Sequence, residues 1–260
     1  MTGNSSTRIV TESDRKLFEA LAEARVLDRE QASEITGRRE VSVSTCNAWL
    51  LKLVRAGLLK RFFIATDDGG IKSLYCLTPL SAGIVHCDYR PIPRPADSVL
   101  KSEPFVLHQL AVNSLFVQVK YQPAPSKEIE VVRWLTFSEP ISNTTQLMPD
   151  GYFELKNRGD LHSMFCEVDR GTESLKIWTE KTRLYLNLAT GGEFQQLFHL
   201  ERFRVLVIAE TERRSSQIRQ TVARQTSKIF WFSTLNVINR QGLFAAHWIR
   251  PEGDDRLSLF

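Results

Sequence analysis

Two apolar, strand-like segments with acidic residues near one end constrain the fold of this chain more than any other feature. The first contains Pro149-Asp150-Gly151, and the second ends in Glu167-Val168-Asp169. Residues 156–160, with the sequence Lys-Asn-Arg-Gly-Asp, are typical of a turn, so we expect the two segments to form a hairpin. Alternate residues of a strand share a face, so Glu167 and Asp169 should lie together while Cys166 and Val168 face the other way. The hairpin then brings Asp150 beside both acids.

Carboxylates gathered at strand ends are typical of Mg²⁺ sites that carry out phosphodiester chemistry. Asp150, Glu167 and Asp169 are therefore the predicted metal ligands, for one or two Mg²⁺ ions. Two other interpretations stay open. In one, Asp150 only makes a turn before a glycine. In the other, Glu167 and Asp169 join a structural ion network with the nearby basic residues Arg170, Lys176 or Lys181.

The sequence of the amino-terminal part predicts three helices and two strands. Ser13-Asp14 is a typical cap for the first helix, Asp28 for a second over 29–36, and Ser42 or Ser44 for a third that ends at Ala56. Strands are expected over 58–65 and 71–78, around a turn at 66–70. The apolar residues of the third helix that recur at helical spacing should face the core, namely Val43, Cys46, Leu50 and Leu53.

This order of elements, with the sequences at 53–61 and 73–79, resembles the winged helix-turn-helix family over residues 13–88. The resemblance implies double-stranded DNA as a partner, because a helix fits the major groove, where polar side chains reach base edges and basic ones meet phosphates. Binding to protein alone is the alternative. The residues expected to contact DNA are Arg38, Arg39, Ser44, Thr45, Asn47, Lys52, Arg55, Lys60 and Arg61.

Three alternating prolines in residues 89–95 predict an extended, semi-rigid connection, although the segment can also pack as an ordered arm. The expected domains are thus 1–88, a linker over 89–103, and 104–260. In the second domain we expect helices over 103–119, 172–188 and 211–225, and strands over 129–137, 146–155, 161–169, 203–209, 230–237 and 244–249. Thr172 is the expected cap of the middle helix, Trp178 and Tyr185 are expected in the core, and the arginines of the last helix should form a solvated basic face.

This order of elements resembles the core of the PD-(D/E)xK nuclease-like superfamily. The residues that carry the resemblance are Pro149-Asp150 on one strand and Glu167-Val168-Asp169 on the next. Over residues 13–210 the chain is also similar to the replication-relaxation family of plasmids and other mobile elements. The segments that support this similarity, besides Pro149-Asp150-Gly151, are 108–119, 167–172 and 181–185. The resemblance implies an α+β protein, with a winged helix followed by a restriction-endonuclease-like domain that has a mixed sheet. It implies a role in plasmid replication or DNA relaxation.

The chain departs from the superfamily at the third signature position, which holds Asp169 where a lysine is expected. The resemblance then implies that Lys176 or Lys181, on the following helix, supplies the ammonium group. The implied catalytic set is Asp150, Glu167, Asp169, Lys176 and Lys181.

Composition excludes some classes of protein. The chain has 260 residues, a net charge of +4 and no apolar run long enough for a membrane span. Its four cysteines form no C-x-x-C pair, which favours a cytoplasmic protein with reduced thiols. It also lacks a phosphate-binding loop for ATP.

Three functions remain. The first is a DNA-binding accessory factor of replication or mobilisation, with replication or mobilisation proteins or a second copy of itself as partners. The second is a Mg²⁺-dependent endonuclease or nickase. The third is a transcriptional regulator whose second domain dimerises or senses a ligand.

Overall fold

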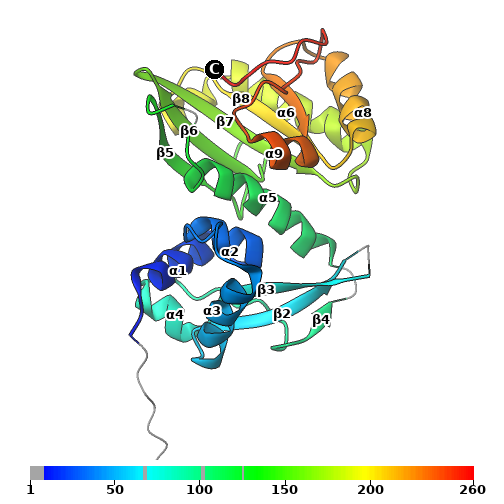
Figure 1. Ribbon diagram of the computed structural model, residues 1–260. Helices are drawn as coiled ribbons and strands as arrows, with labels where there is room; N and C mark the ends of the chain where they lie inside the picture. The colour runs from blue at the N-terminus through cyan, green and yellow to red at the C-terminus, as the bar shows by residue number, and fades with distance from the viewer. Residues whose placement is uncertain (1–8, 67–68, 101–102, 125) are drawn as a thin grey trace, which may run out of the picture. The chain divides into compact units, whose positions relative to one another are not determined.

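The computed structural model describes residues 9–66, 69–100, 103–124 and 126–260. Within these residues the chain mixes helices with two sheets, as the predicted α+β class requires (Figure 1). It divides into two compact units, Met1–Val117 and Gln118–Phe260. Asp67 and Asp68, in the predicted turn, lie outside the described residues.

Unit 1 begins with helices and then forms a small sheet. The sheet has the order β1-β3-β2-β4, in which β3 is antiparallel to both β1 and β2, and β4 is parallel to β2. Its elements are α1 (Glu12–Ala24), β1 (Leu27–Asp28), α2 (Arg29–Ile35), α3 (Val43–Arg55), β2 (Leu59–Ala65), β3 (Ile71–Leu77), α4 (Pro79–Ile84), β4 (Val99–Leu100) and the larger part of α5 (Pro104–Lys120).

The helix starts of unit 1 follow from side chains that cap free backbone N–H groups. Asp28 caps α2 and Ser42 caps α3, as predicted. The cap of α1 is Thr11 rather than Ser13-Asp14, because Thr11 and Asp14 bond reciprocally to each other's backbone N–H. Val43 is 58% exposed and not in the core: it is the first residue of α3, and residues 41–45 around this helix start are all exposed.

The first part of α5 belongs to the core of unit 1. Val106 and Leu110 pack with apolar residues of the sheet. Asn113 donates to the carbonyl oxygen of Ala24 at 3.0 Å, and Gln31 donates to that of Leu110 at 2.9 Å. The division between the units therefore falls within α5, beyond the segment 89–103 that we expected to separate the domains.

Unit 2 contains a mixed sheet with the order β5-β6-β7-β8-β9. The first three strands are antiparallel neighbours, and β7, β8 and β9 run parallel. The hairpin of β6 and β7 is the one predicted. The elements are β5 (Ile129–Leu135), β6 (Gly151–Asn157), β7 (Asp160–Asp169), α6 (Leu175–Thr190), α7 (Glu193–Phe198), β8 (Arg204–Ala209), α8 (Glu212–Ala223), β9 (Phe230–Thr234) and α9 (Leu235–Gln241).

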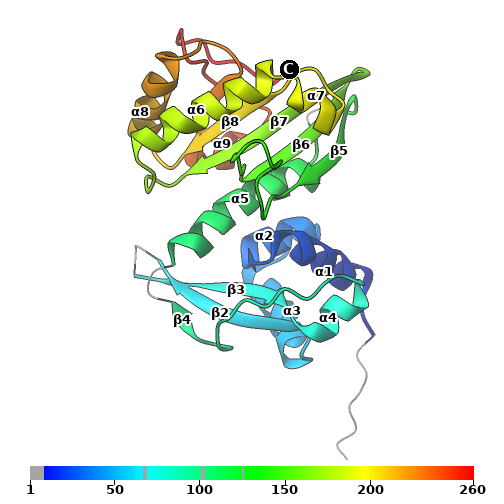
Figure 2. The same cartoon turned by 180° about the vertical axis from the view of Figure 1, so that it is seen from behind.

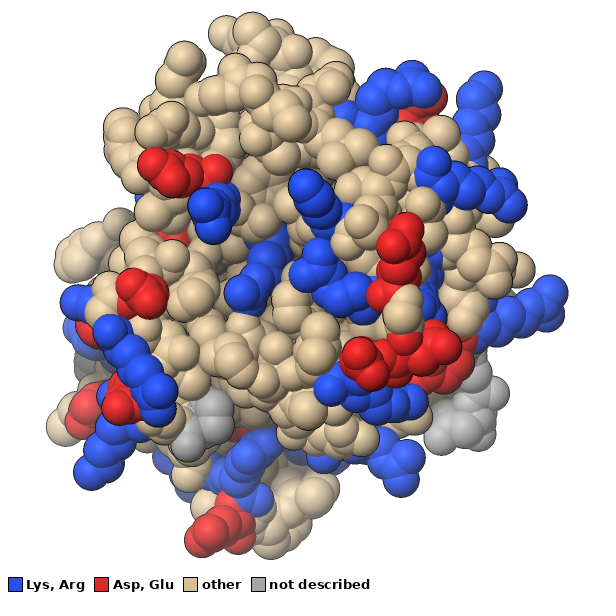
Figure 3. Space-filling view, turned by 90° about the horizontal axis from the view of Figure 1, so that it is seen from above, with Lys and Arg blue, Asp and Glu red and all other residues tan. Residues whose placement is uncertain are grey.

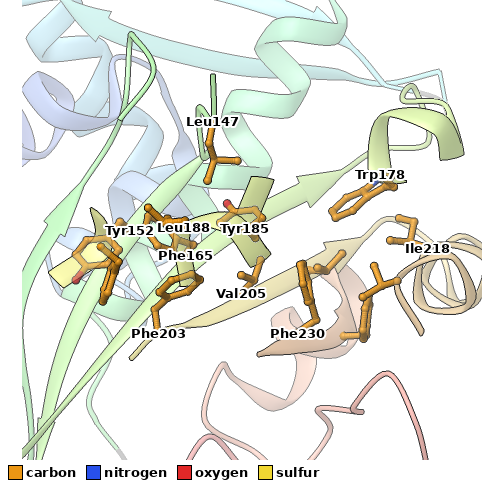
Figure 4. Packing of buried hydrophobic residues seen from close by; sticks show 14 of the residues in the cluster. Leu147, Tyr152, Phe165, Trp178, Tyr185, Leu188, Phe203, Val205, Ile218 and Phe230 are labelled. Atoms are coloured by element: carbon orange, nitrogen blue, oxygen red, sulfur yellow. The ribbon is translucent and has the colours of Figure 1, made fainter. Parts of the chain in front are cut away.

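One face of this sheet is covered by α6 and α8, and α9 lies on the other (Figures 1 and 2). Alternate residues of the parallel strands, such as Phe165, Val205 and Phe230, point toward α6 and α8 and form a largely aromatic core (Figure 4). Trp178 and Tyr185 of α6 belong to this core, as predicted. The core packs β7 and β8 against α6 and α8.

Several predicted boundaries in unit 2 are wrong. The strand expected over 146–155 begins only at Gly151, and α6 is capped by Ser174, not by Thr172. The strand expected over 230–237 ends at Thr234, whose side chain caps α9. The strand expected over 244–249 is reduced to a bridge between Ile249 and Phe232. The helices α4, α7 and α9 were not predicted.

Candidate functional site

Glu167 and Asp169 share the face of β7 that packs on the helices, as strand alternation predicts. Both are 1% exposed. Asp150 lies next to them, because Gly151 pairs with Cys166 in the antiparallel ladder. One Asp150 carboxylate oxygen accepts a hydrogen bond from the Val168 backbone N–H at 2.7 Å. The hairpin therefore brings the three acids together, but it points their oxygens at different partners.

Glu167 binds two side chains of α6. Its Oε2 lies 2.8 Å from Lys181 Nζ, and its Oε1 accepts a hydrogen bond from the Tyr185 hydroxyl at 2.6 Å. Burial raises the pKa of Glu167 to about 7, with a contribution from the charge of Asp150, against the attraction of the Lys181 ammonium. Lys181 also pairs with Glu173 at 2.9 Å.

Asp169 is bound more completely. Arg214 of α8 donates to both of its oxygens, from Nε at 2.7 Å and from Nη2 at 2.8 Å. The Gly171 backbone N–H and Trp178 Nε1 each donate at 2.7 Å as well. Burial alone would raise the pKa of Asp169, but the hydrogen bonds from Arg214, Trp178 and Gly171 outweigh it and the pKa is lowered. Asp169 is thus held as a carboxylate by four donors.

Local sequence explains this arrangement. Trp178, Lys181 and Tyr185 recur at intervals of three and four residues, so they share the face of α6 that lies over the end of β7. The capped start of α6 at Ser174 sets that face. Helical spacing alone could have placed these three residues beside the acids, whereas no local signal connects Arg214 to Asp169.

The structure separates the two candidate lysines. Lys181 approaches Glu167, whereas Lys176 is exposed on α6 and takes part in no described ion pair. Arg170 pairs with Glu210 at 2.9 Å and not with the buried acids. Arg214, expected on a solvated face, has a side chain that is only 13% exposed.

The donor set does not fit a divalent cation. Both Asp169 oxygens face a guanidinium group, and both Glu167 oxygens face side-chain donors. Within the described ranges, no three His, Cys, Asp or Glu side chains are grouped so that they could hold a metal ion. A cation would have to displace Lys181 and Arg214 before it could reach these carboxylate oxygens.

Unit 1 carries the second candidate site, the exposed face of α3. Ser44, Thr45, Asn47, Lys52 and Arg55 are all exposed, while the opposite face is buried through Cys46, Trp49, Leu50 and Leu53. In the part of the chain that is described, neither Lys52 nor Arg55 has a carboxylate partner. A groove of about 590 Å³ runs between α3 and the β2–β3 hairpin, lined by Asn47, Leu51 and Lys72 among others.

The other predicted DNA contacts have partners within unit 1. Arg39 pairs with Glu34, and Arg61 pairs with Asp97 at 2.6 Å. Lys60 Nζ donates to the carbonyl oxygen of Ile92 at 3.0 Å. The Arg38 guanidinium lies 4.5 Å from the centroid of the Trp49 ring. These contacts link the four side chains to the surroundings of α3, whereas Lys52 and Arg55 lie exposed on α3 itself.

None of the helices in the described residues is long and apolar enough to span a membrane.

Comparisons with known proteins place the chain in a family. No curated protein and no solved structure matches the chain. The family model described as Replication-relaxation matches residues 18–200. Because this match covers well over half of the chain, the chain belongs to the Replication-relaxation family.

Proposed function

We propose that this chain is a DNA-binding protein that acts in the replication or relaxation of plasmids or other mobile elements. Unit 1 acts as a winged helix-turn-helix module that reads duplex DNA with α3. Unit 2 acts as a nuclease-like platform for binding or assembly. Family membership supports the biological role. The observation that carries DNA binding is the exposed, polar and basic face of α3.

The face of α3 suits the major groove for physical reasons. Its buried side fixes the helix on unit 1, so the exposed side chains are presented from a rigid support. Asn47 can donate to and accept from base edges, and Lys52 and Arg55 can meet phosphates without first leaving an acidic partner. Ser42 bonds to the hydroxyl groups of Ser44 and Thr45 at 3.0 and 2.9 Å, which orients both for contact.

The elements after α3 support the winged-helix interpretation. The hairpin of β2 and β3 follows α3 directly and forms the far wall of the groove beside Asn47. Arg61 and Lys72 of this hairpin line the same groove, next to the helix. Ion pairs of Arg61 with Asp97 and of Lys72 with Asp28 hold these side chains in position.

A platform role for unit 2 is supported by the saturation of its acids. Hydrolysis of DNA by this fold would need carboxylate oxygens that are open to a cation. Here Arg214 and Trp178 occupy Asp169, and Lys181 and Tyr185 occupy Glu167. These contacts suit a structural network better than a cutting site.

The test is a titration of a fluorescent duplex of mixed sequence with the full chain, followed by anisotropy. Asn47→Ala combined with Lys52→Ala should weaken binding about tenfold, because a base-edge contact and a phosphate contact are both lost. Arg90→Ala removes an exposed cation outside α3 and the hairpin, and it should change affinity less than about twofold. Equal affinities for wild type and the α3 variant would remove α3 as the DNA reader.

A further inference from the structure

A second charged region lies at the opposite end of the parallel strands from the buried acids. A cavity of about 900 Å³ opens at the amino ends of β7, β8 and β9. It is lined by four cationic side chains, Arg202, Arg204, Lys228 and Arg250. In the space-filling view, lysine and arginine side chains gather around a hollow and acidic side chains keep to its sides (Figure 3).

The four cations are not neutralised by the protein. Among the described residues none of them forms an ion pair, and the two acids of the lining, Asp160 and Glu201, are exposed and pair with none of them. Burial lowers the pKa of Arg204, and the positive charge of Arg250 lowers it further. The two guanidinium groups are therefore close enough to repel each other. Like charges held together without a counter-ion destabilise a fold unless an anion joins them.

Trp231 holds the two inner arginines in place. Its ring is 7% exposed, and the guanidinium carbons of Arg204 and Arg250 each lie 5.0 Å from the ring centroid. The backbone at Arg250 is fixed in turn by Arg219, which donates to its carbonyl oxygen at 2.7 Å. These two arginines are therefore positioned before any ligand arrives.

Two hydrogen-bond donors in this region have no acceptor among the described residues, although Arg204 Nη1 donates to the carbonyl oxygen of Leu259. Arg250 Nη2 donates to the carbonyl oxygen of Ser227 at 3.0 Å, but Arg250 Nε and Trp231 Nε1 are buried and have no acceptor among the described residues. Buried donors normally have an acceptor, so the protein leaves two donors unsatisfied beside the cationic lining.

We propose that this cavity binds a phosphate group, the chemistry shared by a free nucleotide and by the backbone of a nucleic acid. Phosphate offers several charged acceptor oxygens to the planar donors of arginine, and a volume of about 900 Å³ admits a whole nucleotide. The site lies within unit 2 and uses no residue of α3, so this proposal can be tested independently of DNA binding by unit 1.

The experiment is isothermal titration of the full chain with three probes: pyrophosphate, a deoxynucleoside monophosphate and a short single-stranded oligonucleotide. The test variant is Arg202→Gln combined with Lys228→Gln, two exposed side chains whose loss should leave the fold intact. The charge-matched control is Arg213→Gln combined with Lys176→Gln, both exposed on unit 2 and outside the cavity lining.

At least one probe should bind the wild type, the cavity variant should bind it about tenfold or more weakly, and the control should stay within about twofold. If the monophosphate binds as tightly as the oligonucleotide, the source is a nucleotide. If only the oligonucleotide binds, the source is a nucleic acid backbone. The proposal is overturned if none of the probes binds the wild type, or if the cavity variant and the control lose affinity equally.

Discussion

The exposed face of α3 and the carboxyl end of β7 are both rich in the charged residues that mark a functional site in a sequence, yet the two regions treat charge differently. At β7, Asp169 is matched by Arg214, and Glu167 by Lys181. On α3, Lys52 and Arg55 have no acidic partner within the described chain. The protein therefore pairs the charges of the first region internally and leaves those of the second exposed to solvent.

The difference has an energetic basis. A buried charge must be paired, because taking it out of water costs several kcal/mol that only a close partner offsets. An exposed lysine or arginine keeps its hydration and carries no such cost. Asp169, whose pKa is lowered by its donors, therefore helps to hold the fold together, and the cations of α3 remain available to meet phosphates.

The largest expected effect is on the Asp169 pair. Asp169→Asn removes the charge that holds Arg214, whose side chain is 13% exposed, and should lower the free energy of unfolding by about 3–5 kcal/mol. Glu210→Gln is the matched control, since it breaks the more exposed pair with Arg170 and should cost about 1 kcal/mol or less. Urea denaturation measures both. Similar small losses in the two variants would show that the Asp169 network is not structural.

A smaller effect is expected from the protonation of Glu167, which faces Lys181, Tyr185 and Asp150. The pKa of Glu167 is about 7 in the folded chain, against an ordinary value of 4.5. Between about pH 4.5 and 7 the folded chain therefore keeps a proton on Glu167 that the unfolded chain has lost. The stability due to this proton is full below about pH 4.5 and is lost as pH rises through about 7.

Wild type and Glu167→Gln share every other titrating group, so the difference between their unfolding free energies isolates Glu167. This difference, wild type minus variant, should fall by up to about 3 kcal/mol as pH rises over that window. Urea titrations at a series of pH values supply the curve. A difference that stays flat or rises with pH would contradict the assignment.

The smallest expected effect is that of a divalent cation. A site that bound Mg²⁺ would stabilise the chain by about 2.7 kcal/mol at a concentration 100 times its Kd. Because Arg214 and Lys181 already occupy the acids, we expect the same melting temperature with Mg²⁺ or Mn²⁺ and with a chelator. A rise with metal in the wild type that is absent in Asp150→Asn would restore the cation site, and with it the endonuclease interpretation.

Sequence reasoning succeeded where the signal was local. The starts of α2 and α3 were predicted because Asp28 and Ser42 act within one turn of the helix that they cap. The shared face of Glu167 and Asp169 followed from strand alternation alone. It failed where a distant residue decides the outcome. Arg214 reaches Asp169 from α8, 45 residues along the chain.

Pro149-Asp150-Gly151 illustrates the same limit. The motif suggested a metal ligand or a turn, but Gly151 opens β6. A Cβ atom at this position would lie 2.9 Å from Trp134 Cζ2, so a glycine is needed for the ring of a neighbouring strand to pack there. That requirement comes from tertiary packing and leaves no local signal.

In the proposed function, α3 meets DNA through charges that the protein itself leaves without acidic partners among the described residues. The most direct test of this proposal is the salt dependence of duplex affinity for the wild type, Lys52→Ala and Arg90→Ala. Each phosphate contact contributes about 0.9 to the slope of log affinity against log salt concentration. We predict that Lys52→Ala reduces the magnitude of this slope by about one unit while Arg90→Ala leaves it unchanged. An unchanged slope for Lys52→Ala would contradict the proposal.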